Sequence, residues 1–106
     1  MARALINVPK TAKRGQIIEI KTLISHVMET GFRRTETGAI IPRNILTELV
    51  CTYNGDEIFR ASLYPAVSAN PFITFFTIAK ESGTLTFKWT GDHGFEQMAS
   101  ASITIE

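Results

Sequence analysis

The sequence predicts an all-β protein, an antiparallel β-sandwich of about seven strands. Short runs alternate between apolar and polar side chains, which is the two-residue period of a half-buried strand. Turn-forming residues separate these runs at regular spacing, and no segment shows sustained helical periodicity. About seven short strands with such turns are typical of an immunoglobulin-like (fibronectin-type) sandwich.

The composition is that of one globular domain spanning residues 1–106. A chain of 106 residues, 44% of them hydrophobic, suffices for a single core. Eleven Lys and Arg residues against ten Asp and Glu residues give a formal net charge of +1, so no strong field attracts nucleic acid or an anionic membrane. No run approaches the roughly 18 apolar residues of a spanning helix. We therefore expect neither nucleic acid nor a membrane as a partner.

Two strands are expected at the start of the chain. Ala4–Val8 is a short apolar run stopped by a proline, and a basic turn ending in glycine follows it. The run Gln16–Ser25 then alternates between apolar and polar residues, as a half-buried strand does. Its apolar face holds Ile18, Ile20 and Ile24.

A long connection, Ser25–Arg43, leads to the third strand. Connections of more than about 12 residues in a small domain are usually functional or disordered, and this one is too apolar to be disordered. Aromatic residues, Met and Arg are enriched at the centres of protein interfaces. The connection holds Met28, Phe32, Arg33, Arg34, Ile40, Ile41 and Arg43 together with Glu29. We therefore predict a contact loop.

The third and fourth strands are expected to form a hairpin. The run Asn44–Tyr53 alternates, and Asn54-Gly55 follows it directly. Asn-Gly favours a type I′ turn because both central positions of that turn need a positive φ. Ile58–Leu63 is then the returning strand.

A proline-containing connector, Tyr64–Pro71, precedes a strand that is apolar on both faces. The connector is expected to be rigid and non-helical, and it is a second candidate contact loop. In the strand Phe72–Ala79, one face carries Phe72, Phe76 and Ile78, and the other carries Ile73 and Phe75. The second face must be covered. Either the long connection folds over it, or a partner protein binds it.

Two further alternating runs, Thr84–Thr90 and Ala99–Glu106, complete the sandwich, with a turn at Gly91–Gly94 between them. The predicted core draws on all of the strands after the first. It comprises Ile18, Ile20, Leu49, Cys51, Phe59, Leu63, Phe75, Leu85, Phe87, Trp89, Ile103 and Ile105.

The residues able to carry chemistry are scattered along the chain. A cysteine, two histidines and a methionine are the ligands of a blue-copper site, but Cys51 falls within a strand, with neither His26 nor His93 near it in sequence. A buried structural cysteine is the simpler interpretation, and the histidines lie in predicted loops without a nucleophile motif. We expect no catalytic residue, no metal and no cofactor. A metal-binding or electron-transfer sandwich using His26, Cys51 and His93 remains the alternative.

Basic residues could form a patch for an anion. The candidates are Lys10, Lys13, Arg14, Arg33 and Arg34. A solvated face is the simpler interpretation, because the acidic residues nearly cancel the charge. A generic adhesion or assembly module is a further possibility, for which a secretion signal or tandem copies would be expected.

Several blocks of the sequence, taken in order, resemble the SoxZ family. They are His26–Arg33, Ile41–Arg43, Tyr53–Gly55, Pro65–Pro71 and the strand of Trp89. The resemblance spans essentially the whole chain. Its most specific parts are the Pro-Ala-Val-Ser-Ala-Asn-Pro block and the His-x-Met-Glu-x-Gly-x-Arg block.

The resemblance implies a non-catalytic sandwich that forms a heterodimer with SoxY. In that family the C-terminal Gly-Gly-Cys-Gly-Gly arm of SoxY carries the covalent sulfur intermediate of thiosulfate oxidation between periplasmic enzymes. This chain has no such arm, so we expect it not to bear the substrate. The sequence also shows no signal peptide of its own. The resemblance implies a periplasmic protein that is exported with its partner and meets other Sox proteins through the complex.

The predicted partner-binding residues come from the two candidate contact loops and the strand that follows the second. A permanent heterodimer interface resembles a protein core cut in half, which fits apolar loops bearing arginine. The set is Met28, Glu29, Phe32, Arg33, Ile41, Arg43, Ala66, Val67, Ser68, Asn70 and Phe72.

Overall fold

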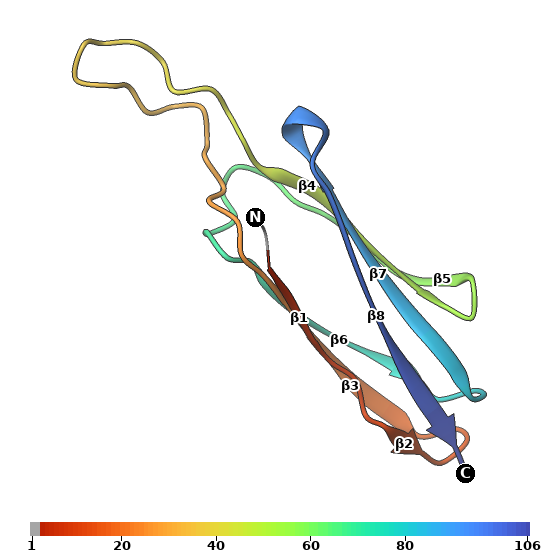
Figure 1. The fold of residues 1–106 in the computed structure, drawn as a ribbon. Helices are drawn as coiled ribbons and strands as arrows, with labels where there is room; N and C mark the ends of the chain where they lie inside the picture. The colour runs from red at the N-terminus through yellow and green to blue at the C-terminus, as the bar shows by residue number, and fades with distance from the viewer. Residues whose placement is uncertain (1–2) are drawn as a thin grey trace.

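The computed structural model describes residues 3–106, which form two β-sheets packed face to face (Figure 1). A short 3-10 turn, η1 (Asp92–Gly94), joins the last two strands. The strands within this range are β1 (Ala4–Asn7), β2 (Thr11–Ala12), β3 (Ile17–Ile24), β4 (Leu46–Tyr53), β5 (Asp56–Ser62), β6 (Phe72–Ile78), β7 (Gly83–Gly91) and β8 (Glu96–Ile105).

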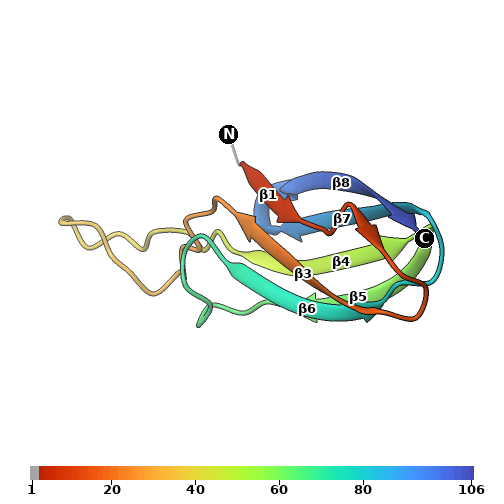
Figure 2. The ribbon, with the colours of Figure 1, turned by 90° about the horizontal axis from the view of Figure 1, so that it is seen from below.

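The strand order confirms the predicted immunoglobulin-like sandwich. One sheet has three strands in the order β1-β3-β6, and the other has five in the order β2-β8-β7-β4-β5. Every pairing is antiparallel except that of β2 with β8. Figure 1 shows the two sheets from the side as separate layers, and Figure 2 looks onto them, with the three-stranded sheet in front of the five-stranded one. The chain passes from one sheet to the other several times along its length. Two packed antiparallel sheets connected in this way are the architecture of immunoglobulin-like domains.

Of the eight strands, β2 is the one that the sequence did not predict. It lies in the segment predicted as a basic turn, and it is only two residues long. Thr11 and Ala12 pair in parallel with Thr104 and Ile105 at the edge of the five-stranded sheet. So short an edge strand has no room for an alternation that could reveal it.

The predicted hairpin is confirmed. β4 and β5 pair around Asn54 and Gly55, which have φ angles of 50° and 87°. Both values lie in the left-handed region that a type I′ turn requires. The Asn54 side chain also fixes the neighbouring turn, because its Oδ1 accepts a hydrogen bond from the Thr84 N–H at 2.9 Å.

The core lies between the two sheets and matches the prediction closely. Phe59 and Ile105 are only partly buried, and the rest of the predicted set is buried. Phe59 stacks on Phe75 with ring centroids 4.1 Å apart, but β5 is an edge strand, so Phe59 has neighbours on one side only. No helix within residues 3–106 is long and apolar enough to cross a membrane.

Candidate protein-interaction surface

The connection between β3 and β4 forms an arm, residues 25–45, that projects from one end of the sandwich (Figure 1). Its two limbs meet at two isolated bridges, Glu29 with Asn44 near the base and Arg34 with Ile40 near the tip. With this projection the molecule measures 60 Å in its longest dimension and about 20 Å in the other two. The arm therefore extends along the strand direction and covers neither sheet.

The base of the arm is anchored inside the core. Met28 is only 4% exposed, and its sulfur accepts a hydrogen bond from the Leu46 N–H at 3.3 Å. The adjacent His26 is 8% exposed and lies edge-on to Phe95. Because the core fixes these side chains, the arm leaves the sandwich in a defined direction.

His26 has a structural role at this base. Its Nδ1 accepts a hydrogen bond from the Met28 N–H at 3.0 Å, so in the neutral ring the proton is on Nε2. Burial lowers the pKa of His26, although the nearby Asp92 carboxylate acts in the opposite direction. His26 is thus a loop histidine that is hydrogen-bonded to the backbone.

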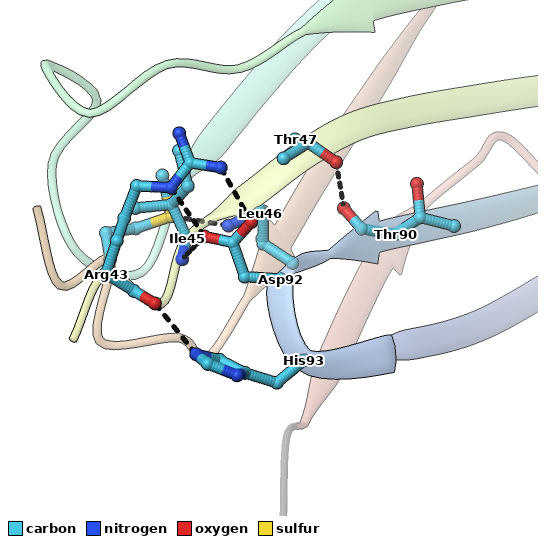
Figure 3. A network of polar contacts seen from close by, with 8 residues as sticks. Arg43, Ile45, Leu46, Thr47, Thr90, Asp92 and His93 are labelled. Carbon is cyan, nitrogen blue, oxygen red and sulfur yellow. Dashed lines mark hydrogen bonds and ion pairs between the residues drawn. The ribbon is translucent and has the colours of Figure 1, made fainter. Parts of the chain in front are cut away.

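The second limb of the arm is clamped to η1 by Asp92 (Figure 3). The Arg43 guanidinium donates two hydrogen bonds of 2.8 Å to the Asp92 carboxylate, and the Ile45 N–H donates a third at 3.1 Å. These donors, Arg43 first, lower the pKa of Asp92. The ring Nε2 of His93 donates to the Arg43 carbonyl at 2.8 Å. Asp92 and His93, which the sequence placed in a predicted turn, thus hold the arm.

The limbs approach closely at Gly31, where φ is +88° and an added Cβ would lie 2.9 Å from the Cβ of Arg43. Nearby, the Glu29 carboxylate accepts hydrogen bonds from the Arg33 guanidinium. This contact lowers the pKa of Glu29. The close approach requires glycine here, because any other residue would be strained by both its φ and the contact.

The arm displays apolar side chains, while its three arginines already have hydrogen-bond partners within the chain. Phe32 is 83% exposed and Ile40 is 58% exposed. Arg34 donates to the Gly38 carbonyl at 2.9 Å, and Arg33 is bonded to Glu29. Exposed aromatic residues beside arginines are typical of protein interfaces.

The second predicted contact loop, which precedes β6, lies against the base of the arm. The Asn70 N–H donates to the His26 carbonyl at 2.8 Å, and the Asn70 Oδ1 accepts from the His26 N–H at 3.0 Å. Asn70 can do this because it adopts a φ of 53°. The two predicted contact segments therefore meet at one end of the molecule.

The outer face of the three-stranded sheet is apolar and uncovered. Its exposed apolar side chains are Leu5, Ile17, Phe72, Phe76 and Ile78. One of the two alternatives from the sequence was that the long connection folds over this face, and the structure shows that this is wrong. The strong anchors at the arm's base direct the connection away from β6. We call this surface the apolar sheet face.

Most of the predicted site residues are exposed. Phe32, Arg33 and Arg43 are exposed on the arm, and Phe72 is exposed on the sheet. The same is true of Ala66, Ser68 and Asn70 in the second loop, whereas Glu29, Ile41 and Val67 are half-buried. Met28 is the exception, because it lies in the core and supports the arm from inside. The role of the exposed set in partner binding stays a prediction.

Sequence reasoning missed part of the apolar sheet face. Ile17 and Leu5 were not predicted to lie on an apolar surface, because each shares its strand face with polar residues. On β3, for example, Ile17 is followed on the same face by Glu19 and Lys21. The signal becomes visible only when the strand register is known, since Ile17 pairs with Ile78.

The basic residues do not form one patch. Arg33 and Arg34 lie on the arm, whereas the basic turn lies beside β2 at the opposite end of the sandwich (Figure 1). In that turn, Arg14 donates to the Lys80 carbonyl at 3.1 Å. The suggested common anion patch is therefore wrong.

Cys51 is sealed in the core. It is 0% exposed and lies on β4, where it pairs with Phe59 of β5 on one side and with Phe87 of β7 on the other. Burial raises the pKa of its thiol to about 12. Among residues 3–106 no three His, Cys, Asp or Glu side chains lie close enough together to hold a metal. The structure gives no support to a site built from His26, Cys51 and His93.

The buried thiol predicts a loss of stability in alkali. An unfolded cysteine ionises above about pH 9, whereas Cys51 in the folded chain does not until about pH 12. Between these values the free energy of unfolding should fall by about 1.4 kcal/mol per pH unit from this group. Urea denaturation from pH 8 to 11 measures the slope, and Cys51→Ala is the matched control. Equal slopes in both proteins would contradict this assignment.

Fold and surface together define a small immunoglobulin-like protein that presents an arm and an uncovered apolar sheet face. A family profile described as "Sulphur oxidation protein SoxZ" matches residues 6–102. The chain therefore belongs to the SoxZ family, as its sequence blocks predicted. A comparison with curated protein sequences finds no match.

Solved structures with the same fold include proteins of two kinds. A superoxide reductase (neelaredoxin) variant from Ignicoccus hospitalis is 18% identical, with a TM-score of 0.76 over 97% of this chain and 79% of that one. A putative superoxide reductase from Thermotoga maritima is 17% identical, with a TM-score of 0.70 over 97% and 85%. The sulfur carrier protein SoxY from Chlorobium limicola f thiosulfatophilum is 11% identical, with a TM-score of 0.65 over 97% and 78%. At these identities the likeness establishes the fold.

Proposed function

We propose that this chain is the non-catalytic subunit of a heterodimeric sulfur carrier, in which it binds and supports a SoxY-like subunit. The observation that carries the proposal is the state of Cys51. A chain of a sulfur-oxidation family would need an accessible thiolate to hold a sulfur intermediate. The sequence has a single cysteine, and that cysteine is 0% exposed with a thiol pKa of about 12. We therefore assign the carrier thiol to the partner.

We infer that the partner binds at the end of the molecule that carries the arm and the loop before β6. The arm offers Phe32 and Ile40, and the clamp between Arg43 and Asp92 fixes it in place before binding. A surface that is already ordered loses little conformational entropy on association. The partner we propose is a SoxY-like subunit whose glycine-flanked cysteine arm carries the sulfur. Other Sox proteins meet this chain through the complex, in the periplasm, to which it is exported with the partner.

Reconstitution with a purified SoxY-like subunit tests the proposal. We expect a 1:1 heterodimer by sedimentation, and Phe32→Ala should weaken it about 10-fold because an exposed aromatic anchor is lost. Lys88→Ala, on the far face of the five-stranded sheet, is the matched control and should bind as the natural chain does. Failure of the natural chain to bind would overturn the proposal.

The same complex tests the role of Cys51. Cys51→Ala should leave sulfur loading of the partner unchanged once the complex has formed, because the carrier thiol is not on this chain. Loading is read from the intact mass of the partner. A loss of loading in a folded Cys51→Ala heterodimer would show that the thiol takes part in the chemistry.

A further inference from the structure

The pairing of three strands brings their apolar side chains together on the apolar sheet face. Leu5 on β1 pairs with Leu23 on β3, and Leu23 pairs with Phe72 on β6. At the other end of the face Ile17 pairs with Ile78. Between these two apolar rows, Glu19 and Lys21 neutralise each other at 3.4 Å. The face is therefore apolar at both ends and carries no net charge from its central pair.

The outer face of the five-stranded sheet is polar, in contrast to the apolar sheet face. There the five-stranded sheet presents an open hollow lined mainly by polar and charged side chains, among them Glu48, Thr52, Arg60, Thr86 and Lys88. Arg60 and Lys88 both form ion pairs on this face. Antiparallel sheets with one solvated face normally alternate in this way. The three-stranded sheet departs from the pattern, and uncovered apolar patches of this kind mark interaction sites.

Two hollows on the apolar sheet face share Leu5 and Leu23. One, of about 220 Å³, extends to Phe72, and the other, of about 230 Å³, extends to Asn70. Both are open and mostly apolar, so they can receive side chains of an opposing surface. Through Asn70 the face is continuous with the loop at the base of the arm.

The size of the face fits a protein partner. Phe72 and Phe76 are 61% and 62% exposed, and Ile17 is 68% exposed. From such exposures the face offers on the order of 500 Å² of apolar surface. Each partner in a standard interface buries about 800 Å², and about 65% of a homodimer-like interface is apolar. The apolar area needed and the area offered agree.

We propose that the apolar sheet face docks the SoxY-like subunit sheet against sheet, which deepens and rests on the proposed function. A SoxY of known structure has the same two-sheet fold over 97% of this chain, so such a partner has a sheet of its own to lay on this one. Two sheet faces pack about 10 Å apart with interdigitating side chains. The two hollows beside Leu5 and Leu23 receive side chains of the partner. The arm extends the contact at one end.

Charged substitutions on the face test this docking mode. Phe76→Lys and Ile17→Lys should each weaken the heterodimer about 100-fold or more, because they place an unpaired charge in a buried contact. Both positions are exposed in the free chain, so thermal melting should not change. Thr86→Lys, on the polar outer face, is the matched control. Natural affinity in both face variants, with Phe32→Ala still weakened, would overturn the docking mode and leave the proposed function standing.

Hydroxyl-radical footprinting of the natural chain gives a second test that needs no substitution. In the heterodimer Phe72 and Phe76 should be protected, while Met98, 53% exposed on the other outer face, should stay reactive. Unprotected phenylalanines in a formed heterodimer would overturn the proposal. So would a dimer of this chain alone that Phe76→Lys abolishes, since a second copy would then occupy the face.

Discussion

Trp89→Ala is expected to lower the free energy of unfolding by about 3–5 kcal/mol. Trp89 is 1% exposed, and its ring lies against that of Phe87 with centroids 6.3 Å apart. Its strand, β7, is the middle one of the five-stranded sheet and pairs with β4 and β8. Removing the indole leaves a cavity that two flanking strands cannot close. Domains of this size are stable by only about 5–15 kcal/mol, so much of the stability would be lost.

Urea denaturation of Trp89→Ala and Met98→Ala measures this loss against a control. Met98 lies on β8 with its side chain 53% exposed, so its removal should cost about 0.5 kcal/mol or less. Similar losses in the two variants would contradict the assignment of Trp89 as the centre of the core.

Met28→Ala is the second substitution with a large expected effect, about 2–5 kcal/mol of stability. Met28 fills the core beneath the arm, and its sulfur accepts the Leu46 N–H. Alanine would leave a cavity and an unpaired N–H at the start of β4. Loss of this anchor should also loosen the base of the arm, which distinguishes it from an ordinary core substitution.

Hydrogen exchange of the Leu46 and Asn44 amides follows the base of the arm directly. In the natural chain the Asn44 N–H is bonded to the Glu29 carbonyl at 2.8 Å, and it should exchange faster in Met28→Ala. The matched control is Val27→Ala, because Val27 is the preceding residue and is 68% exposed. Unchanged exchange in Met28→Ala would show that the clamp at Asp92 holds the arm alone.

Local signals in the sequence were enough for most of the fold. Alternation identified β3, β4 and β7 because each has one face in the core, and Asn54-Gly55 identified a turn whose geometry few other residue pairs allow. The strand β2 escaped because two residues show no period. The start of β8 at Glu96, three residues before the predicted start, was missed because its first residues lie at a less buried end of the strand.

The candidate surface was harder to predict because it depends on contacts between distant segments. The sequence identified the long connection as a contact loop, but its direction is set by Asp92, which lies 49 residues from Arg43. Met28 has the composition of an interface residue and yet is buried, since an apolar side chain is suited to a core and an interface alike. The apolar sheet face arises only when register places β1, β3 and β6 side by side.

The central claim is that this chain supports a partner that carries the sulfur. The most direct measurement is the intact mass of both components of the complex that a tagged copy of this chain forms in periplasmic extract of sulfur-grown cells. The account predicts a stoichiometric SoxY-like partner with sulfur on its glycine-flanked cysteine, and this chain at its unmodified mass. A sulfur adduct on Cys51, or a chain that is isolated without a partner and with bound metal, would contradict it.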